Sequence, residues 1–144
     1  CCKTLPGAAW PKDFGAPDEK VLYENLLNAL TSYKYALDYW EGRVRGQDDD
    51  DDRTAYYVRP ATVDGYVRKR VVDASWGGIC VFWSEAAGCS LSDLERPTQC
   101  RLLVPKADYN CDTYADGGFE KEDAAIAWLP YNDLIERVRK DLDA

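Results

Sequence analysis

Residues 17–42 read PDEKVLYENLLNALTSYKYALDYWEG, and the element that this stretch predicts determines how the rest of the chain must pack. Pro17, Asp18 and Glu19 at its beginning and Gly42 at its end are typical of the two ends of a helix. We therefore expect one amphipathic helix of about six turns that packs on a sheet. Its apolar stripe recurs at steps of three or four residues, at Leu22, Leu26, Leu30, Tyr33, Leu37 and Trp40.

From residue 53 the residue pattern becomes typical of β-strands, because four segments are rich in Val, Tyr, Trp and Ile. The segments are RTAYYVRP (53–60), GYVRKRVVDASW (65–76), GICVFWSE (78–85) and TQCRLLVPK (98–106). Turn residues in PATVDG (60–65) favour a hairpin between the first two segments. Short connections favour pairing of strands that are neighbours in sequence, so we expect four antiparallel strands.

Three helical features complete the expected fold. A capping-box pattern over residues 92–95 indicates a helical turn between the third and fourth strands. A short helix is expected over 120–128, because Pro130 disfavours its continuation. Apolar spacing from Leu134 to Leu142 predicts a terminal helix, with Asn132 as its cap.

The six cysteines favour a disulfide framework over a metal site, because the chain has no CxxC motif and no histidine. Cysteine connectivity stays open. A lipid-bearing Cys1, as in bacterial lipoproteins, is the alternative, but it would leave an odd number of other cysteines. The expected disulfide-forming residues are Cys1, Cys2, Cys80, Cys89, Cys100 and Cys111.

The expected architecture is thus a single domain over residues 1–144. Its fold class is α+β: a four-stranded antiparallel sheet packed by a long N-terminal helix and a C-terminal helix, disulfide-stapled.

Composition excludes several function classes. The absence of histidine excludes Ser-His-Asp triads, Cys-His proteases and histidine-ligated zinc. The net charge of −8 disfavours binding to nucleic acid and to anionic membranes. A chain that begins at Cys1 and contains no Met is expected to have lost a leader, which indicates secretion.

A basic and aromatic face on the first predicted hairpin is the candidate partner-binding surface. If Arg59 lies opposite Tyr66, six side chains share one sheet face and could bind an acidic patch or stack on a partner. The alternative is that the arginines pair with the aspartates at 48–52 and only solubilise that face. The six residues are Arg53, Tyr57, Arg59, Tyr66, Arg68 and Arg70.

Two other function classes stay open. A histidine-free hydrolase of the glycosidase type would use a pair of carboxylates. Its candidate acids are Glu85, Asp116, Glu120 and Glu122. A protease inhibitor of the cystatin type would present a rigid apolar loop tip. The candidates for that tip are the dipeptides Val104-Pro105 and Leu129-Pro130.

One short segment resembles a known enzyme family. ADYNCDTY (107–114) resembles the YxC segment of fungal guanyl ribonucleases and their inactive effector relatives, through Tyr109, Asn110, Cys111 and Tyr114. The catalytic histidine of that family has no counterpart here, so ribonuclease activity is not implied.

The whole arrangement resembles secreted effectors of plant-pathogenic fungi. Six cysteines, an acidic surface and a long helix on a four-stranded sheet are similar to the LARS avirulence effectors of Leptosphaeria and Fulvia. This resemblance of architecture implies no individual site residue. It implies a disulfide-tied sheet, no enzymatic activity, action on or inside plant tissue and recognition by host resistance proteins. We expect a secreted monomer that binds a host protein and uses no cofactor, nucleic acid or membrane.

Overall fold

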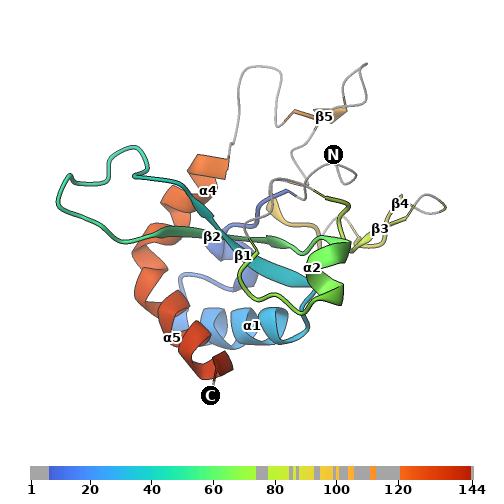
Figure 1. The fold of residues 1–144 in the computed structure, drawn as a ribbon, viewed down its shortest axis with the longest axis horizontal. Coiled ribbons are helices and arrows are strands. Elements are labelled where there is room, and N and C mark those ends of the chain that lie inside the picture. Colours follow the sequence, from blue (N-terminus) through green and yellow to red (C-terminus); the bar gives the residue numbers. More distant parts are fainter. Residues whose placement is uncertain are drawn as a thin grey trace.

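The computed structural model describes residues 7–73, 78–84, 86, 88–92, 95–98, 100, 104–105, 111–112 and 121–143. The part of the chain described is α+β (Figure 1). Its helices are η1 (Pro11–Phe14), α1 (Glu19–Thr31), α2 (Val63–Val67), α4 (Lys121–Trp128), η2 (Leu129–Tyr131) and α5 (Asn132–Asp143). Its strands are β1 (Tyr35–Trp40), β2 (Ala55–Pro60), β3 (Trp83–Ser84), β4 (Gly88–Cys89), β5 (Val104–Pro105) and β6 (Cys111–Asp112).

The centre of the fold is an antiparallel pair of strands, β1 and β2, in which Leu37 lies opposite Val58. Single-residue bridges flank this pair: Ala9 bonds to Val58 on one edge, and Val72 runs parallel to Leu37 on the other. The expected four-stranded antiparallel sheet is therefore wrong. Within the described residues, each named sheet has two strands, and the flanking segments contribute one bridge each.

The long helix expected over 17–42 is also wrong beyond Thr31. The backbone of Tyr33 has φ of 61°, in the left-handed region, and its N–H donates to the carbonyl of Leu30. This geometry ends a helix. The residues after it form β1 instead, because aromatic and apolar side chains gain more from pairing with β2 than from continuing a helical stripe.

The segment expected as the second strand of a hairpin with 53–60 contains α2 instead. The hydroxyl of Thr62 accepts a hydrogen bond from the Gly65 N–H at 3.0 Å and caps this short helix. The residues of PATVDG therefore begin a helix and do not form a hairpin turn. The partner of β2 is β1, across a loop over residues 41–54.

The two helices predicted for the last third of the chain are confirmed by α4 and α5, but Asn132 is the first residue of α5 and its side chain donates to the Thr54 carbonyl at 2.7 Å, so its predicted role as a cap is wrong. α1 and α5 lie side by side beside the hairpin (Figure 1), and the hydroxyl of Tyr23 on α1 donates to Asp141 on α5. The Ser92 N–H donates to the carboxylate of Glu95, as the capping-box pattern predicts, and hydrogen bonds from the side chain and from the N–H of Ser92 lower the pKa of Glu95. The core combines the buried stripe of α1 with both strands and both C-terminal helices, including Leu22, Leu26, Leu30, Leu37, Val58, Trp128, Ile135 and Val138.

The expected disulfide framework is not found among the described residues. No disulfide joins Cys80, Cys89 and Cys100, the cysteines whose side chains are described, to one another. These three residues lie near Tyr35, whose pKa is raised by burial and, to a smaller extent, by the three cysteines. An even number of cysteines does not fix the geometry that a disulfide bond requires, so the cysteine count alone does not predict one. Cys1, Cys2 and the side chain of Cys111 lie outside the described residues.

Candidate functional site

The six residues predicted to form one binding face do not lie on one face. Tyr57 and Arg59 are on β2 and point into a buried layer, where Arg59 is 0% exposed. Tyr66 is on α2, and Arg68 and Arg70 follow that helix. Arg53 lies before β2 and lines a separate groove. The predicted register placed them together only because it assumed a strand where α2 forms.

Arg59 is the centre of a buried polar network. Its Nε donates to Asp38 Oδ2 at 3.1 Å, and its two Nη atoms donate to the carbonyls of Pro60 and Asp73 at 3.1 and 2.7 Å. The Tyr57 hydroxyl donates to the same Asp38 oxygen at 2.9 Å. Burial and the charge of Asp38 raise the pKa of Tyr57, so its hydroxyl stays a donor.

The same network extends to the cap of α2. The carboxylate of Asp73 accepts from the Thr62 hydroxyl at 3.4 Å and lies 3.9 Å from both Arg59 and Arg70. A Cβ at Gly65 would come within 2.5 Å of Asp73, so this glycine lets the helix approach the carboxylate. The polar groups of this network bond to one another. We therefore assign the network a structural role, in which it holds α2 on the sheet.

One exposed surface gathers apolar and basic side chains. Val63, Tyr66 and Val67 lie on α2, and Ile79 is joined to this helix through its carbonyl, which accepts from the Val63 N–H. Val67 is 70% exposed, and the other three are 40 to 45% exposed. The consecutive residues Arg68, Lys69 and Arg70 follow directly. We call these seven residues the α2 surface.

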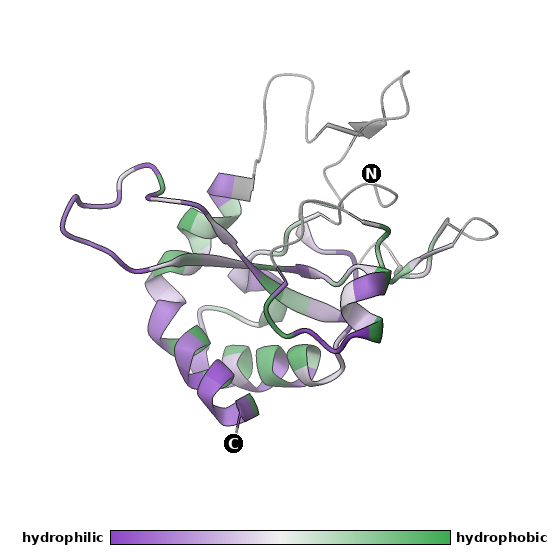
Figure 2. Cartoon of the chain, viewed as in Figure 1, coloured by the Kyte–Doolittle hydropathy of each residue, from purple (hydrophilic) through white to green (hydrophobic). Residues whose placement is uncertain are grey.

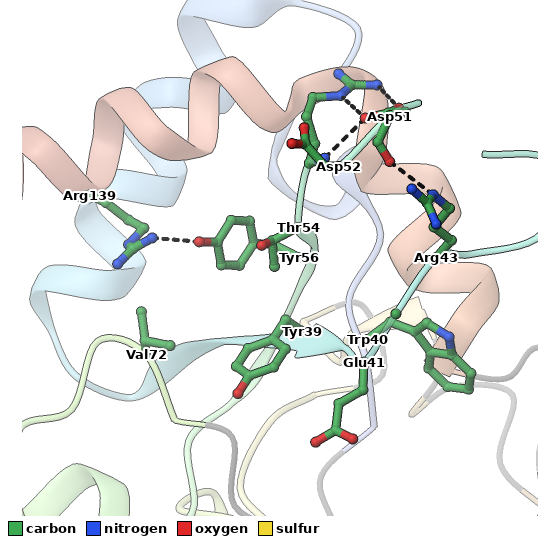
Figure 3. Close-up of a pocket in the computed structure, with 12 residues that line it drawn as sticks. Tyr39, Trp40, Glu41, Arg43, Asp51, Asp52, Thr54, Tyr56, Val72 and Arg139 are labelled. Atoms are coloured by element: carbon green, nitrogen blue, oxygen red, sulfur yellow. Dashed lines mark hydrogen bonds and ion pairs between the residues drawn. The ribbon is translucent and has the colours of Figure 1, made fainter. Parts of the chain in front are cut away.

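A groove of about 750 Å³ lies at the end of the central strands that the loop over residues 41–54 connects (Figure 3). We call it the hairpin groove. It is lined by the ends of β1 and β2, by both ends of their connecting loop, by Val72 and by α5. Its lining comprises Tyr39, Trp40, Glu41, Gly42, Arg43, Asp51, Asp52, Arg53, Thr54, Tyr56, Val72 and Arg139.

On the loop side of the groove, two arginines, Arg43 and Arg53, bond to the aspartate run. Arg53 donates from Nε and Nη2 to both carboxylate oxygens of Asp51, at 3.0 and 2.9 Å, and this pairing lowers the pKa of Asp51 far below its ordinary value. Arg43 donates to the backbone carbonyls of Asp49 and Asp51. Among the residues that the structure describes, no carboxylate forms an ion pair with Arg43, so its charge stays available to a partner.

The helix side of the groove joins Arg139 to Tyr56. The guanidinium donates to the Tyr56 hydroxyl at 2.5 Å and lies 5.4 Å from the centre of the same ring (Figure 3). Burial raises the pKa of Tyr56, and the opposing charge of Arg139 only partly offsets this effect. Tyr39 lies opposite Tyr56 in the strand pair and is 37% exposed, so the groove presents aromatic side chains to solvent.

Of the residues expected for the other function classes, those that the structure describes are spread over separate elements. Glu85, Asp116 and Glu120 lie outside the described residues. Glu122 pairs with Arg45 at 3.0 Å on the surface. Val104 and Pro105 are in β5, and Leu129 and Pro130 are in η2.

The described residues also bear on metals and membranes. They contain no group of three or more His, Cys, Asp or Glu side chains placed to hold a metal ion. Among their helices, none has the length and apolar character needed to cross a bilayer.

Comparison with protein-family models, curated proteins and solved structures returns no match, so the site must be interpreted from its own residues.

Sequence reasoning found one of the groove residues, Arg53, and missed the others. Trp40 is part of the predicted helical stripe, and the sequence pattern of the terminal helix gives Arg139 no role. A signal for the groove existed in the alternation of YALDYW (35–40), where strand geometry places Tyr39 and Trp40 on opposite faces at the end of β1.

Proposed function

We propose that this chain is a non-catalytic binding protein that holds a partner protein in the hairpin groove. The observation that carries the proposal is the composition of the lining. Six of its twelve residues are Trp, Tyr or Arg, the three types that dominate binding energy at protein interfaces. They are Tyr39, Trp40, Arg43, Arg53, Tyr56 and Arg139.

Binding in the groove also costs little side-chain entropy. Hydrogen bonds already hold Arg43, Arg53 and Arg139 in place, so little side-chain entropy is lost when a partner arrives. Glu41 and Asp52 at the rim can pair with basic groups of the partner, and Arg43 with an acidic group. This mixture suits a polar protein surface with an aromatic or aliphatic side chain at its centre.

The groove chemistry favours binding over the hydrolase alternative. A general acid needs a raised pKa, whereas Arg53 lowers the pKa of Asp51. The buried Asp38 and Asp73 are enclosed by Arg59, Tyr57 and Thr62, and Arg59 bonds to both residues.

We further propose that the partner is a plant protein and that the protein acts after secretion. This part of the proposal is supported by the six cysteines and the acidic composition, which resemble those of fungal effectors, and not by the four-stranded disulfide-tied sheet, which the described residues do not form. The hairpin groove gives the proposal a defined surface that can be tested in plant extract.

The test compares proteins captured from plant extract by the wild type and by Trp40→Ala and Arg43→Glu. We expect both variants to lose at least about tenfold of the same captured protein, as for interface residues of high energy. Lys140→Glu, an exposed basic residue on α5 outside the groove lining, is the control and should retain it. Thermal unfolding of each variant shows whether it is folded. If folded Trp40→Ala and Arg43→Glu capture the same proteins at the same level as the wild type, the groove is not the binding site.

A further inference from the structure

We propose that the α2 surface of one molecule binds the acidic loop of a second copy, so that the protein self-associates head to tail. The acidic loop is defined as residues 48–52, five consecutive aspartates. The acidic loop shares Asp51 and Asp52 with the hairpin groove, but this proposal does not rest on the proposed function, because its test uses the purified protein alone and needs no other partner.

The α2 surface has the character of an interface that lacks a partner. Three of its apolar residues, Val63, Tyr66 and Val67, are on one short helix, and Val67 is the most exposed at 70%. Ile79 extends the patch from a second segment. Exposed apolar residues are ordinary when scattered, but a contiguous group beside concentrated charge is typical of a binding surface.

The charge of this surface is opposite to that of the molecule. Arg68, Lys69 and Arg70 are consecutive and exposed in a protein whose net charge is −8. Arg68 pairs with Asp64 on the surface, at 2.9 Å with both side chains at least 60% exposed. Such a pair is weak in water and can exchange its carboxylate for that of a partner.

The acidic loop supplies the complementary charge. The carboxylate of Asp51 forms an ion pair with Arg53, but the other four aspartates of the loop are exposed: Asp48, Asp49, Asp50 and Asp52. Among the described residues, none of these four carboxylates forms an ion pair. Figure 2 shows this loop as a continuous hydrophilic stretch.

The two surfaces cannot meet within one molecule. The loop over residues 41–54 and α2 lie at opposite ends of the central strands β1 and β2 (Figure 1). The arginines after α2 therefore cannot pair with their own acidic loop, as one interpretation of the sequence supposed. A second copy placed end to end can satisfy both surfaces, and Trp40 and Tyr39 beside the loop give Val67 and Tyr66 an apolar contact. Such a head-to-tail contact leaves one surface of each kind free and can propagate.

The test is a charge exchange measured by sedimentation of the purified full chain. At low salt the wild type should self-associate with a dissociation constant of about 0.1 mM, and about 0.5 M NaCl should weaken it at least about tenfold. Arg68→Glu/Lys69→Asp should abolish association, and Asp49→Lys/Asp50→Lys should do the same. An equimolar mixture of the two variants should associate again, because each then offers the charge that the other lacks.

The control is Lys20→Glu/Lys140→Glu, which lowers the net charge as much as Arg68→Glu/Lys69→Asp at two exposed sites outside both surfaces. It should keep most of the association. A wild type that remains monomeric at about 1 mM and low salt overturns the proposal, as does a mixture of the two variants that stays monomeric. A monomeric wild type that instead sediments with phosphatidylserine-rich vesicles would assign the α2 surface to a membrane.

Discussion

Arg59 shows how one residue can be misjudged from sequence and still be decisive for the fold. An arginine on a strand rich in tyrosine suggests a solvent-facing position, because guanidinium groups are seldom fully buried. The structure buries it completely, since Asp38 lies on the opposite strand and Asp73 on the neighbouring segment. No sequence pattern links residues this far apart, so only the observed register of β1 and β2 reveals the network.

Replacing Arg59 should therefore be costly. Arg59→Met keeps much of the side-chain volume but leaves the carboxylate of Asp38 buried without its ion-pair partner, and we expect the free energy of unfolding to fall by about 3–5 kcal/mol. Urea unfolding measures this loss. Arg68→Met, which removes an exposed pair, should change stability by less than about 1 kcal/mol.

A second variant separates charge from packing. Arg59→Met/Asp38→Asn removes the uncompensated carboxylate and should be more stable than Arg59→Met alone. If the double variant is less stable than Arg59→Met, the loss arises from packing and not from a buried charge.

At the scale of elements, the sequence predicted three helices, overextended the first of them, missed α2 and predicted the strands poorly. The apolar spacing of α1 and α5 and the proline after α4 are local signals, so the existence of these helices could be inferred. The switch from helix to strand after Thr31 could not, because Tyr33, Leu37 and Trp40 fit a helical stripe as well as a strand. The groove depends on this switch, since it places Tyr39 and Trp40 at the end of β1.

Tyr33 is the residue at which this switch can be tested. Its φ of 61° is costly for a side chain with a Cβ, by about 1–2 kcal/mol, and most costly for a β-branched one. Tyr33→Gly should relieve this cost, and Tyr33→Val should increase it. We expect the glycine variant to exceed the valine variant in unfolding free energy by at least about 1 kcal/mol, measured by urea unfolding. Equal stabilities would contradict a left-handed end of α1.

At the scale of the whole molecule, the sheet could not be predicted because its edges come from distant parts of the chain. The Ala9 N–H donates to Val58 on β2, and the backbone on either side of Val72, at Val71 and Asp73, bonds to Leu37 on β1. Each segment contributes a single bridge, which is too short to leave a strand pattern. The loop between β1 and β2 carries the aspartate run, and four of its five aspartates are exposed. That exposure is the part of the proposed self-association that composition alone could suggest.

Trp128 joins the two ends of the described chain and provides the test at this scale. Its indole Nε1–H donates to the carbonyl of Ala9 at 2.8 Å, and its side chain is fully buried beside Phe14. Trp128→Phe leaves that carbonyl unsatisfied and opens a small cavity, so unfolding should become easier by about 2–4 kcal/mol.

The same variant should also change hydrogen exchange. The Ala9 N–H bonds to the Val58 carbonyl on β2, at 2.7 Å, so the amides of Ala9 and of α4 should lose protection together in Trp128→Phe. Trp40→Phe, at a partly buried tryptophan in the groove, should change neither stability nor exchange by a comparable amount. Faster exchange confined to α4, with Ala9 still protected, would mean that the N-terminal segment is held to the sheet without Trp128.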